Sequence, residues 1–580
     1  MKMMMKMLCA AFTILQASCF ISCVDTVILP DDKTVDEDFW KTKSDVQLVV
    51  NAAYGAMLDQ DLITRLIIWG DMRSDELTPV TTINRNQALI EDLAEINTAN
   101  TQYDNQFVTW DRFYAVINNC NIVLERAEAV MSEDPSYTRG DYLADCSQML
   151  ALRALCYFYL VRNYRDVPYY STAYMTSSQD MELPQTAPDS VLRACIADLK
   201  QAEPNAIAPS AYSDWRRVGY INRDAIQALL ADIYLWLGSV EHSRADLEQA
   251  VAYCDKVIDS KKEQHRAIGG YAVDDDSYPL AEGRFMFDQL FIRQNAEESI
   301  FELQFNGSSN SNGAVATYYN TYNGTAGNPP YLRAPAMFAY NGDVYKVGTV
   351  VRDYRGLMNT FRSSEEKLDV RKMVDNNSWS PQNATGNQQT KSNRSNTNYA
   401  QNYIIYRLTD VMLMKAEALV ALADSAEDDE QLEAAFNLVE AVNTRALDDA
   451  TKSSAMKWST YRGNISKIEM LVLDERLREL AFEGKRWYDL LRFNYRHTEG
   501  VDYHATLAAI SAAGRPFAEN YAEMLALMVR KFETGGNAVS SKMRTEPSLY
   551  LPVPKVDIEV NPNLRQNPVY SMDDEYSKNY

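Results

Sequence analysis

Residues 471–492 read LVLDERLRELAFEGKRWYDLLR, and this stretch says more about the fold than any other part of the chain. Its first part carries apolar residues at helical spacing, namely Leu473, Leu477, Leu480 and Ala481. Gly484 then permits a break, and the basic residues after it suit the negative end of a helix dipole. Trp487 starts a second helical turn. The stretch therefore predicts two helices that meet at the corner of a helical bundle.

Three carboxylates follow one another in this stretch in steps of four, which raises the question of an enzyme. They are Glu475, Glu479 and Glu483. A glycoside hydrolase needs carboxylates on opposite sides of a sugar, whereas residues four apart on one helix share a single face. Structural ion pairs with the neighbouring arginines are the better interpretation; these are Arg476, Arg478 and Arg486. We therefore predict no catalytic residues, and neither a P-loop nor a nucleophile elbow is present.

Helical periodicity dominates both ends of the chain and predicts a mainly α fold. The expected helices span residues 45–62, 107–131, 142–164, 190–202, 222–237, 402–423 and 429–445. They suggest antiparallel pairs stacked as in tetratricopeptide repeats, where each pair buries its apolar face on the next. Between about 269 and 400 the pattern changes to polar loops and short strands, of which residues 299–305 are the clearest. We expect one α-rich body that carries an irregular, loop-rich lobe.

The first residues have the pattern of a secretory signal. Lys2 and Lys6 precede an apolar run over residues 7–21 that is too short to span a membrane as a mature helix. Cys23 has Phe20 three residues before it, as a lipoprotein peptidase requires. We therefore expect residues 1–22 to be a lipoprotein signal peptide and Cys23 to be the lipid anchor, with an ordinary cleaved signal as the alternative.

Composition excludes several function classes. A net charge of −23 makes nucleic acid an unsuitable partner. The cysteines and the four histidines are scattered without zinc-type spacing, so we predict no metal site and no cofactor. Cys120 and Cys156 lie among apolar helical residues and are interpreted as small buried hydrophobic side chains.

The polar lobe contains the side chains that carbohydrate recognition uses. Flat aromatic rings stack on sugar C–H groups, while amides and guanidinium groups reach neighbouring hydroxyls. One stretch supplies both without helical spacing: Tyr318, Tyr319, Tyr322 and Tyr331, with Asn320, Asn323 and Arg333 among them. Trp379 is a further candidate. The alternative for each ring is that it packs the interior of the lobe.

Several motifs resemble those of the SusD/RagB family, whose members are surface lipoproteins that capture nutrients above outer-membrane transporters. Besides residues 471–492 these are WGDMRSDE (69–76), RALCYFY (153–159), YRLTDVMLMKAEA (406–418), LPVPK (551–555) and NPNLRQNP (561–568). The resemblance covers nearly the whole mature chain. It implies a SusD-like fold with an N-terminal region over residues 23–220 and a C-terminal region over residues 221–580.

The resemblance also implies where a ligand binds. In the family, loops after the first helices and loops from mid-chain build the glycan site. Here the N-terminal loop would contribute Trp69, Arg73, Asn84 and Arg85. Trp69 also belongs to a structural part of the family pattern, so a place in the core is the alternative for it.

The function that follows is an outer-membrane, surface-exposed lipoprotein without catalysis. It would capture oligo- or polysaccharides and pass them to a SusC-like TonB-dependent transporter, with the membrane contacted through its N-terminal lipid. Three alternatives stay open. The first keeps the architecture but binds peptides or another nutrient, as the RagB branch resembles. The second is a glycoside hydrolase, and the third is a purely structural repeat scaffold that binds no ligand.

Overall fold

The computed structural model describes residues 39–81, 86–176, 178–268, 277–281, 283–319, 330–338, 353–362, 368–370, 399–427, 429–447 and 456–570. Helices form most of this part of the chain, as the periodicity predicts. No helix within it is long and apolar enough to cross a membrane.

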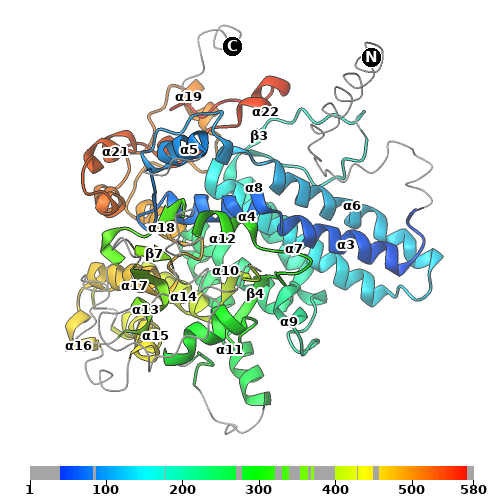
Figure 1. Ribbon diagram of the computed structural model, residues 1–580, viewed down its shortest axis with the longest axis horizontal. Coiled ribbons are helices and arrows are strands. Elements are labelled where there is room, and N and C mark those ends of the chain that lie inside the picture. Colours follow the sequence, from blue (N-terminus) through cyan, green and yellow to red (C-terminus); the bar gives the residue numbers. More distant parts are fainter. Residues whose placement is uncertain are drawn as a thin grey trace, which may run out of the picture.

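The first helices form one side-by-side stack, visible on the right of Figure 1. It consists of α3 (Lys43–Met57), α6 (Asp111–Glu133), α7 (Arg139–Tyr164) and α8 (Pro188–Ala202), with each helix packed on the next in that order. Thr42 and Thr138 each begin a helix with a capping box. Because α7 lies between α6 and α8, its second half is buried on every side.

The second stack continues from the first through α10 (Arg223–Val240), which contacts α7 and α8. It adds α11 (Arg244–Ile268), α14 (Leu408–Leu422), α15 (Asp429–Ala446), α17 (Ile465–Glu479) and α18 (Arg486–Arg496). Here α10 packs on α11, α11 on α14, and α14 on both α15 and α17. One hydrophobic core runs through both stacks, and Cys120 and Cys156 are buried in it as predicted.

Two predicted helices differ from the structure. Residues 45–62 contain a break, because α3 ends at Met57 and Asp59 caps a new helix, α4 (Gln60–Ile67). The helix predicted from residue 402 begins only at Leu408. The residues before it form β8 (Tyr403–Arg407), which pairs antiparallel with β4 (Ser299–Leu303). Their isoleucines and tyrosines favour a strand once such a partner is present.

The other strands are short. β1 (Thr78–Pro79) pairs with β5 (Leu332–Arg333), β2 (Val167–Pro168) with β3 (Gln185–Thr186), and β6 (Thr360–Arg362) with β7 (Leu368–Val370), all antiparallel. The remaining helices are α5 (Gln87–Asn97), α9 (Arg216–Gly219), α12 (Gly313–Tyr319), α13 (Tyr354–Asn359), α16 (Trp458–Tyr461), α19 (Leu507–Ala512), α20 (Ala522–Met528), α21 (Gly536–Lys542) and α22 (Lys555–Val560). A π-helical turn, η1 (Ile68–Met72), follows α4.

The corner predicted between the helices of residues 471–492 is present, but α17 ends at Glu479, four residues before Glu483. The connecting turn holds Phe482 and Gly484 in the left-handed region, at φ of 62° and 72°. A Cβ on Gly484 would lie 2.3 Å from the hydroxyl oxygen of Tyr403, so only glycine fits this close approach.

At this corner, residues 71–76 from the N-terminal part of the chain contact residues 482–486 from its C-terminal part. The backbone N–H of Gly484 donates to Asp71 at 2.8 Å, and that of Phe482 donates to Glu76 at 3.1 Å. Arg486 donates to Asp75 at 2.8 Å. The WGDMRSDE motif therefore supplies three carboxylates to the corner, and the two motifs form one structural unit.

Candidate functional site

The N-terminal and mid-chain segments expected to build a binding site meet at the β1–β5 pair. Thr78 lies opposite Arg333, and Pro79 lies opposite Leu332. The backbone N–H of Val80 donates to the carbonyl of Tyr331 at 2.8 Å. Val80 and Tyr331 therefore lie side by side where this strand pair continues.

The aromatic side chains described at this junction are buried. The exposed fraction is 5% for Tyr318, 1% for Tyr319 and 7% for Tyr331. The ring of Tyr318 packs against those of Phe107 and Tyr331. A ring without an exposed face cannot stack on a sugar, so the structure supports the alternative in which these tyrosines fill the interior.

Trp69 belongs to the core as well. Its side chain has no exposed surface, its ring stacks on Phe113 at a centroid distance of 5.0 Å, and its indole N–H donates to the carbonyl of Phe107 at 2.8 Å. Trp69 is therefore a core residue, which was the alternative to a place in the binding site. Several predicted binding residues lie outside the described part of the chain, and their roles stay predictions; they are Asn84, Arg85, Asn320, Tyr322, Asn323 and Trp379, together with the anchor Cys23.

Arg73, unlike Trp69 and the described tyrosines, lines a cavity of about 370 Å³. We call this cavity the basic pocket. It lies between the chain that leaves α5, residues 96–103, and C-terminal segments that include α21 and Tyr570. Figure 1 shows α5 and α21 near each other at the upper left. The docking of Asp71 and Asp75 on the corner places Arg73, which stands between them, at the pocket wall.

The basic pocket combines cations, amides and aromatic rings. The cations are Arg73, Lys531 and Lys542; the amides are Asn97, Asn100 and Gln102; the rings are Tyr103, Trp487, Phe532 and Tyr570. No Asp or Glu occurs among the described residues that line it. This is the inventory that recognition of a polar, ring-shaped ligand requires.

Burial affects two of these cations strongly. It lowers the pKa of Arg73 to about 10 and that of Lys531 to about 7, and Asp75 acts against the second shift. The guanidinium of Arg73 lies over the ring of Trp487, 4.4 Å from its centroid. Sequence reasoning found Arg73 but missed both lysines, which come from another region of the chain and belong to no local motif.

The carboxylates that raised the question of an enzyme are bound to arginines in the core. Glu475, Glu479 and Glu483 are at most 2% exposed. Arg407 donates to Glu479 at 2.6 Å and to Glu483 at 2.8 Å. Structural ion pairs are thus confirmed, although most partners come from other segments. Of the arginines expected as partners, Arg478 pairs with Glu475, whereas Arg476 pairs with Asp410 and Asp489, and Arg486 with Asp75.

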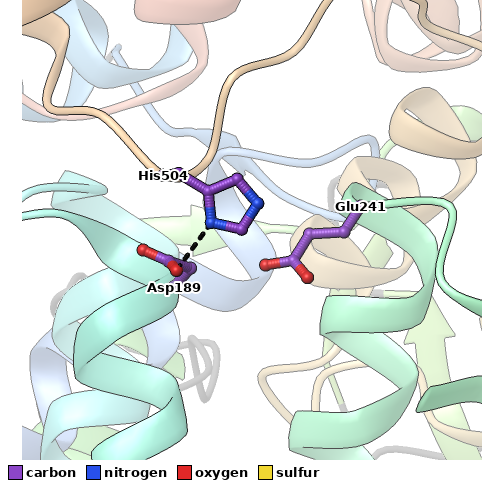
Figure 2. Close-up of side chains that lie close together, drawn as sticks. All are labelled: Asp189, Glu241 and His504. Atoms are coloured by element: carbon purple, nitrogen blue, oxygen red, sulfur yellow. Dashed lines mark hydrogen bonds and ion pairs between the residues drawn. The ribbon is translucent and has the colours of Figure 1, made fainter. Parts of the chain in front are cut away.

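One cluster has the composition of a metal site (Figure 2). Asp189, Glu241 and His504 offer ligand atoms that all lie within 4.8 Å of one another. However, His504 is already bonded to Asp189 at 2.7 Å, and Arg193 pairs with Glu241 at 2.8 Å. These ion pairs join α8, the end of α10 and the loop before α19.

Two family models match the chain. The model of the SusD family matches residues 333–570, and a SusD-like model described as "Starch-binding associating with outer membrane" matches residues 36–235. These ranges do not overlap and together take in most of the chain.

Individual proteins agree with this assignment. SusD-like protein P38 of Formosa agariphila is 26% identical over 485 residues, which cover 80% of this chain and 86% of that protein. SusD-like protein P2 of the same organism is 23% identical over 500 residues, which cover 81% and 88%.

Solved structures show the same fold. A SusD superfamily protein from Bacteroides thetaiotaomicron has a TM-score of 0.63 at 21% identity and covers 92% of this chain and 99% of its own. NanU from B. fragilis has a TM-score of 0.62 at 17% identity and covers 94% and 100%. The helical stacks, the corner motif and these likenesses together show that the chain belongs to the SusD/RagB family.

Proposed function

We propose that this protein binds glycans at the cell surface and delivers them to a SusC-like TonB-dependent transporter in the outer membrane. The family model matched by residues 36–235 is described as starch-binding and outer-membrane-associated, which supports both the ligand class and the location. Cys23 would hold the protein at the membrane through its lipid. Binding, without catalysis, would be its work.

The observation that carries this proposal is the chemistry of the basic pocket. Tyr103 is half-buried at its edge, so its ring keeps one part in contact with the protein and another open to a ligand. Asn100 and Gln102, on the same segment, are exposed and line the same pocket with planar amides. A ring beside several amides is the arrangement that sugars require.

The non-enzymatic part of the proposal rests on the arrangement of the core carboxylates. Arg355, Arg407 and Arg445 are bonded to Glu479. A glycosidase acid or nucleophile has to face the scissile bond across a cleft, whereas this carboxylate has no exposed surface. Release of sugar products from a polysaccharide panel by the purified protein would contradict this part.

Affinity electrophoresis tests ligand binding. The protein truncated after Cys23 is run through gels that contain different polysaccharides, and we expect one or more to retard it. Tyr103→Ala should reduce the retardation, because a stacking platform is lost. The matched control is Tyr212→Ala, another half-buried tyrosine, which lies outside the pocket and should leave retardation unchanged.

Two results would change the proposal. Unaltered migration in every gel, together with recovery of oligopeptides in a pulldown, would favour peptide cargo instead. Retardation that is insensitive to Tyr103→Ala would favour the other predicted binding residues as the glycan site, of which Tyr322 and Asn84 are the ones to substitute next.

A further inference from the structure

The basic pocket contains two buried cations to which no carboxylate is bonded. Arg73 and Lys531 are 9% and 7% exposed. Arg73 donates to the side chain of Asn163 and to the carbonyl of Leu549, and Lys531 donates to the carbonyls of Met72 and Leu77. None of these acceptors is a carboxylate.

Several other buried cations of this chain do have carboxylate partners, although Lys261, like Lys531, donates to backbone carbonyls, those of Glu297 and Ser299. Arg492 bonds Glu417 at 2.8 Å, and Arg486 bonds Asp75 at 2.8 Å. Burying a cation is costly unless a counter-charge compensates it. With 80 acidic residues in the sequence, an acid-free lining around three cations is a marked departure. The pocket leaves room for a counter-charge that comes from a ligand.

The third cation of the pocket, Lys542, is open to solvent. It lies on the last turn of α21, and its ammonium lies 3.3 Å from the side-chain oxygen of Asn100. Asn100 thus connects the charged side of the pocket to the segment that carries Tyr103. Charge, amide and ring lie together in one cavity.

We propose that the basic pocket binds the carboxylate of an acidic sugar, such as a hexuronic acid unit of a glycan. This inference rests on the glycan-binding function proposed above and narrows its substrate class. The sugar ring lies against the aromatic and amide side chains, and the carboxylate accepts hydrogen bonds from the cations. The protein's net charge of −23 repels polyanions at a distance. In physiological salt, however, the Debye length is roughly 8 Å, so a bound carboxylate interacts mainly with the cations of the pocket.

Titration calorimetry on the mature chain tests the inference with matched ligands. The probes are oligogalacturonate, oligomannuronate and oligoglucuronate, each beside the same oligomer with its carboxyl groups reduced to hydroxymethyl groups. At least one acidic oligomer should bind about tenfold or more tightly than its reduced partner, since each charge-assisted hydrogen bond is worth at least about that factor.

Lys542→Gln is the decisive variant because the side chain is exposed and its loss leaves the fold intact. It should weaken binding of the acidic oligomer severalfold and that of the reduced oligomer by clearly less, because only the acidic oligomer loses a charged contact. Lys467→Gln, at an exposed lysine on α17 outside the pocket, is the matched control and should change neither.

A second readout comes from Lys531. Because burial lowers the pKa of its ammonium to about 7, a carboxylate placed beside it should raise that pKa. Binding near pH 7.5 should therefore take up protons, which calorimetry in buffers of different ionisation enthalpy measures. Reduced oligomers should take up none.

The outcomes separate the two proposals. Equal affinity for acidic and reduced oligomers, or an acidic preference that Lys542→Gln leaves intact, overturns the inference while glycan binding stands. If neutral polysaccharides are bound but no acidic probe is, the inference again fails alone. No binding to any acidic, reduced or neutral glycan removes both.

The chain itself offers one competing source of carboxylates. Tyr570 lines the pocket, and Asp573, Asp574 and Glu575 follow it in the sequence. Replacing them together by Asn, Asn and Gln tests whether they occupy the pocket. If the variant binds the acidic oligomer with unchanged affinity, the sugar is supported as the occupant of the pocket. If the acidic oligomer binds only to the variant, the carboxylates of residues 573–575 occupy the pocket instead, and the assignment to the sugar is overturned.

Discussion

Single residues carry much of the stability of this fold because the core contains ionic networks. Arg407 is fully buried and bonds Glu298, Glu479 and Glu483. Arg407→Met should lower the free energy of unfolding by about 3–5 kcal/mol, since it leaves buried carboxylates without a main partner. Urea unfolding of the soluble protein measures this change.

An exposed ion pair provides the control for that measurement. Arg216 and Asp214 lie 2.8 Å apart, and each side chain is 45% exposed. Arg216→Met should leave the free energy of unfolding nearly unchanged, because solvent screens an exposed ion pair. Equal effects at the two arginines would contradict a structural role for the buried network.

The ion pair between His504 and Asp189 should make a small part of the protein's stability depend on pH. The hydrogen bond to Asp189 raises the pKa of His504 above the ordinary 6.5, and Glu241 and Asp502 act in the same direction. A raised pKa means that the pair stabilises the fold fully below pH 6.5 and that this contribution is lost as the pH rises through the folded-state value. The ring is 70% exposed, so the effect on stability is small.

NMR titration of the His504 ring checks this prediction. The measured pKa should lie above 6.5 in the intact protein and should return toward that value in Asp189→Asn. A titration identical in both proteins would show that the ion pair does not form. Titration with Zn²⁺ would separately reveal whether the same three side chains take a metal.

At the scale of elements, the corner between α17 and α18 depends on two glycines that touch. A Cβ on Gly70 would lie 2.3 Å from the carbonyl oxygen of Gly484, and backbone atoms cannot move aside as a flexible side chain can. Gly70→Ala should therefore destabilise the protein by about 2 kcal/mol or more, in the upper range of overpacking changes. Thermal unfolding followed by circular dichroism measures it.

Gly55 gives the matched comparison, since it also lies in a helix but has open space around its Cα. Gly55→Ala should stabilise the protein by about 0.5–1 kcal/mol, because alanine is the better helix former. If both substitutions act alike, the close approach at the corner is not what selects glycine at residue 70.

The sequence predicts most helices because their apolar faces repeat locally, as in α7 and α15. It cannot predict that residues 403–407 form a strand, since the partner β4 lies about a hundred residues earlier and pairing is decided in three dimensions. The basic pocket likewise depends on contacts between segments that are distant in sequence. Arg73 and Lys531 are brought together only when the WGDMRSDE motif docks on the corner, and no local pattern encodes that contact.

The tyrosines near residue 320 show the converse limit. A loop-rich composition predicts exposed rings, but Tyr318 and Tyr319 belong to the short helix α12 and point into the core. Composition predicts the character of a segment, and burial is set by the elements that pack against it.

At the scale of the whole molecule, the proposed anchor and the folded body should be separable. The described residues begin at Phe39, sixteen residues after the proposed anchor Cys23. Cys23→Ala should therefore leave the unfolding temperature unchanged but release the protein from outer membranes. Fractionation of cells that express the variant checks this, and continued partition with outer membranes would contradict the lipid anchor.

The two helical stacks should unfold as one unit, because the beginning of the chain supplies buried carboxylates whose partners lie near its end. In a fragment that stops at residue 240, Asp71 loses the N–H of Gly484, Asp75 loses Arg486, and Glu76 loses the N–H of Phe482. Buried carboxylates without partners are costly, so the fragment should show no cooperative thermal transition. The whole chain should instead give a single transition that coincides by circular dichroism and tryptophan fluorescence. A sharp transition in the fragment alone would mean that the first stack is an independent domain and that the corner only attaches it.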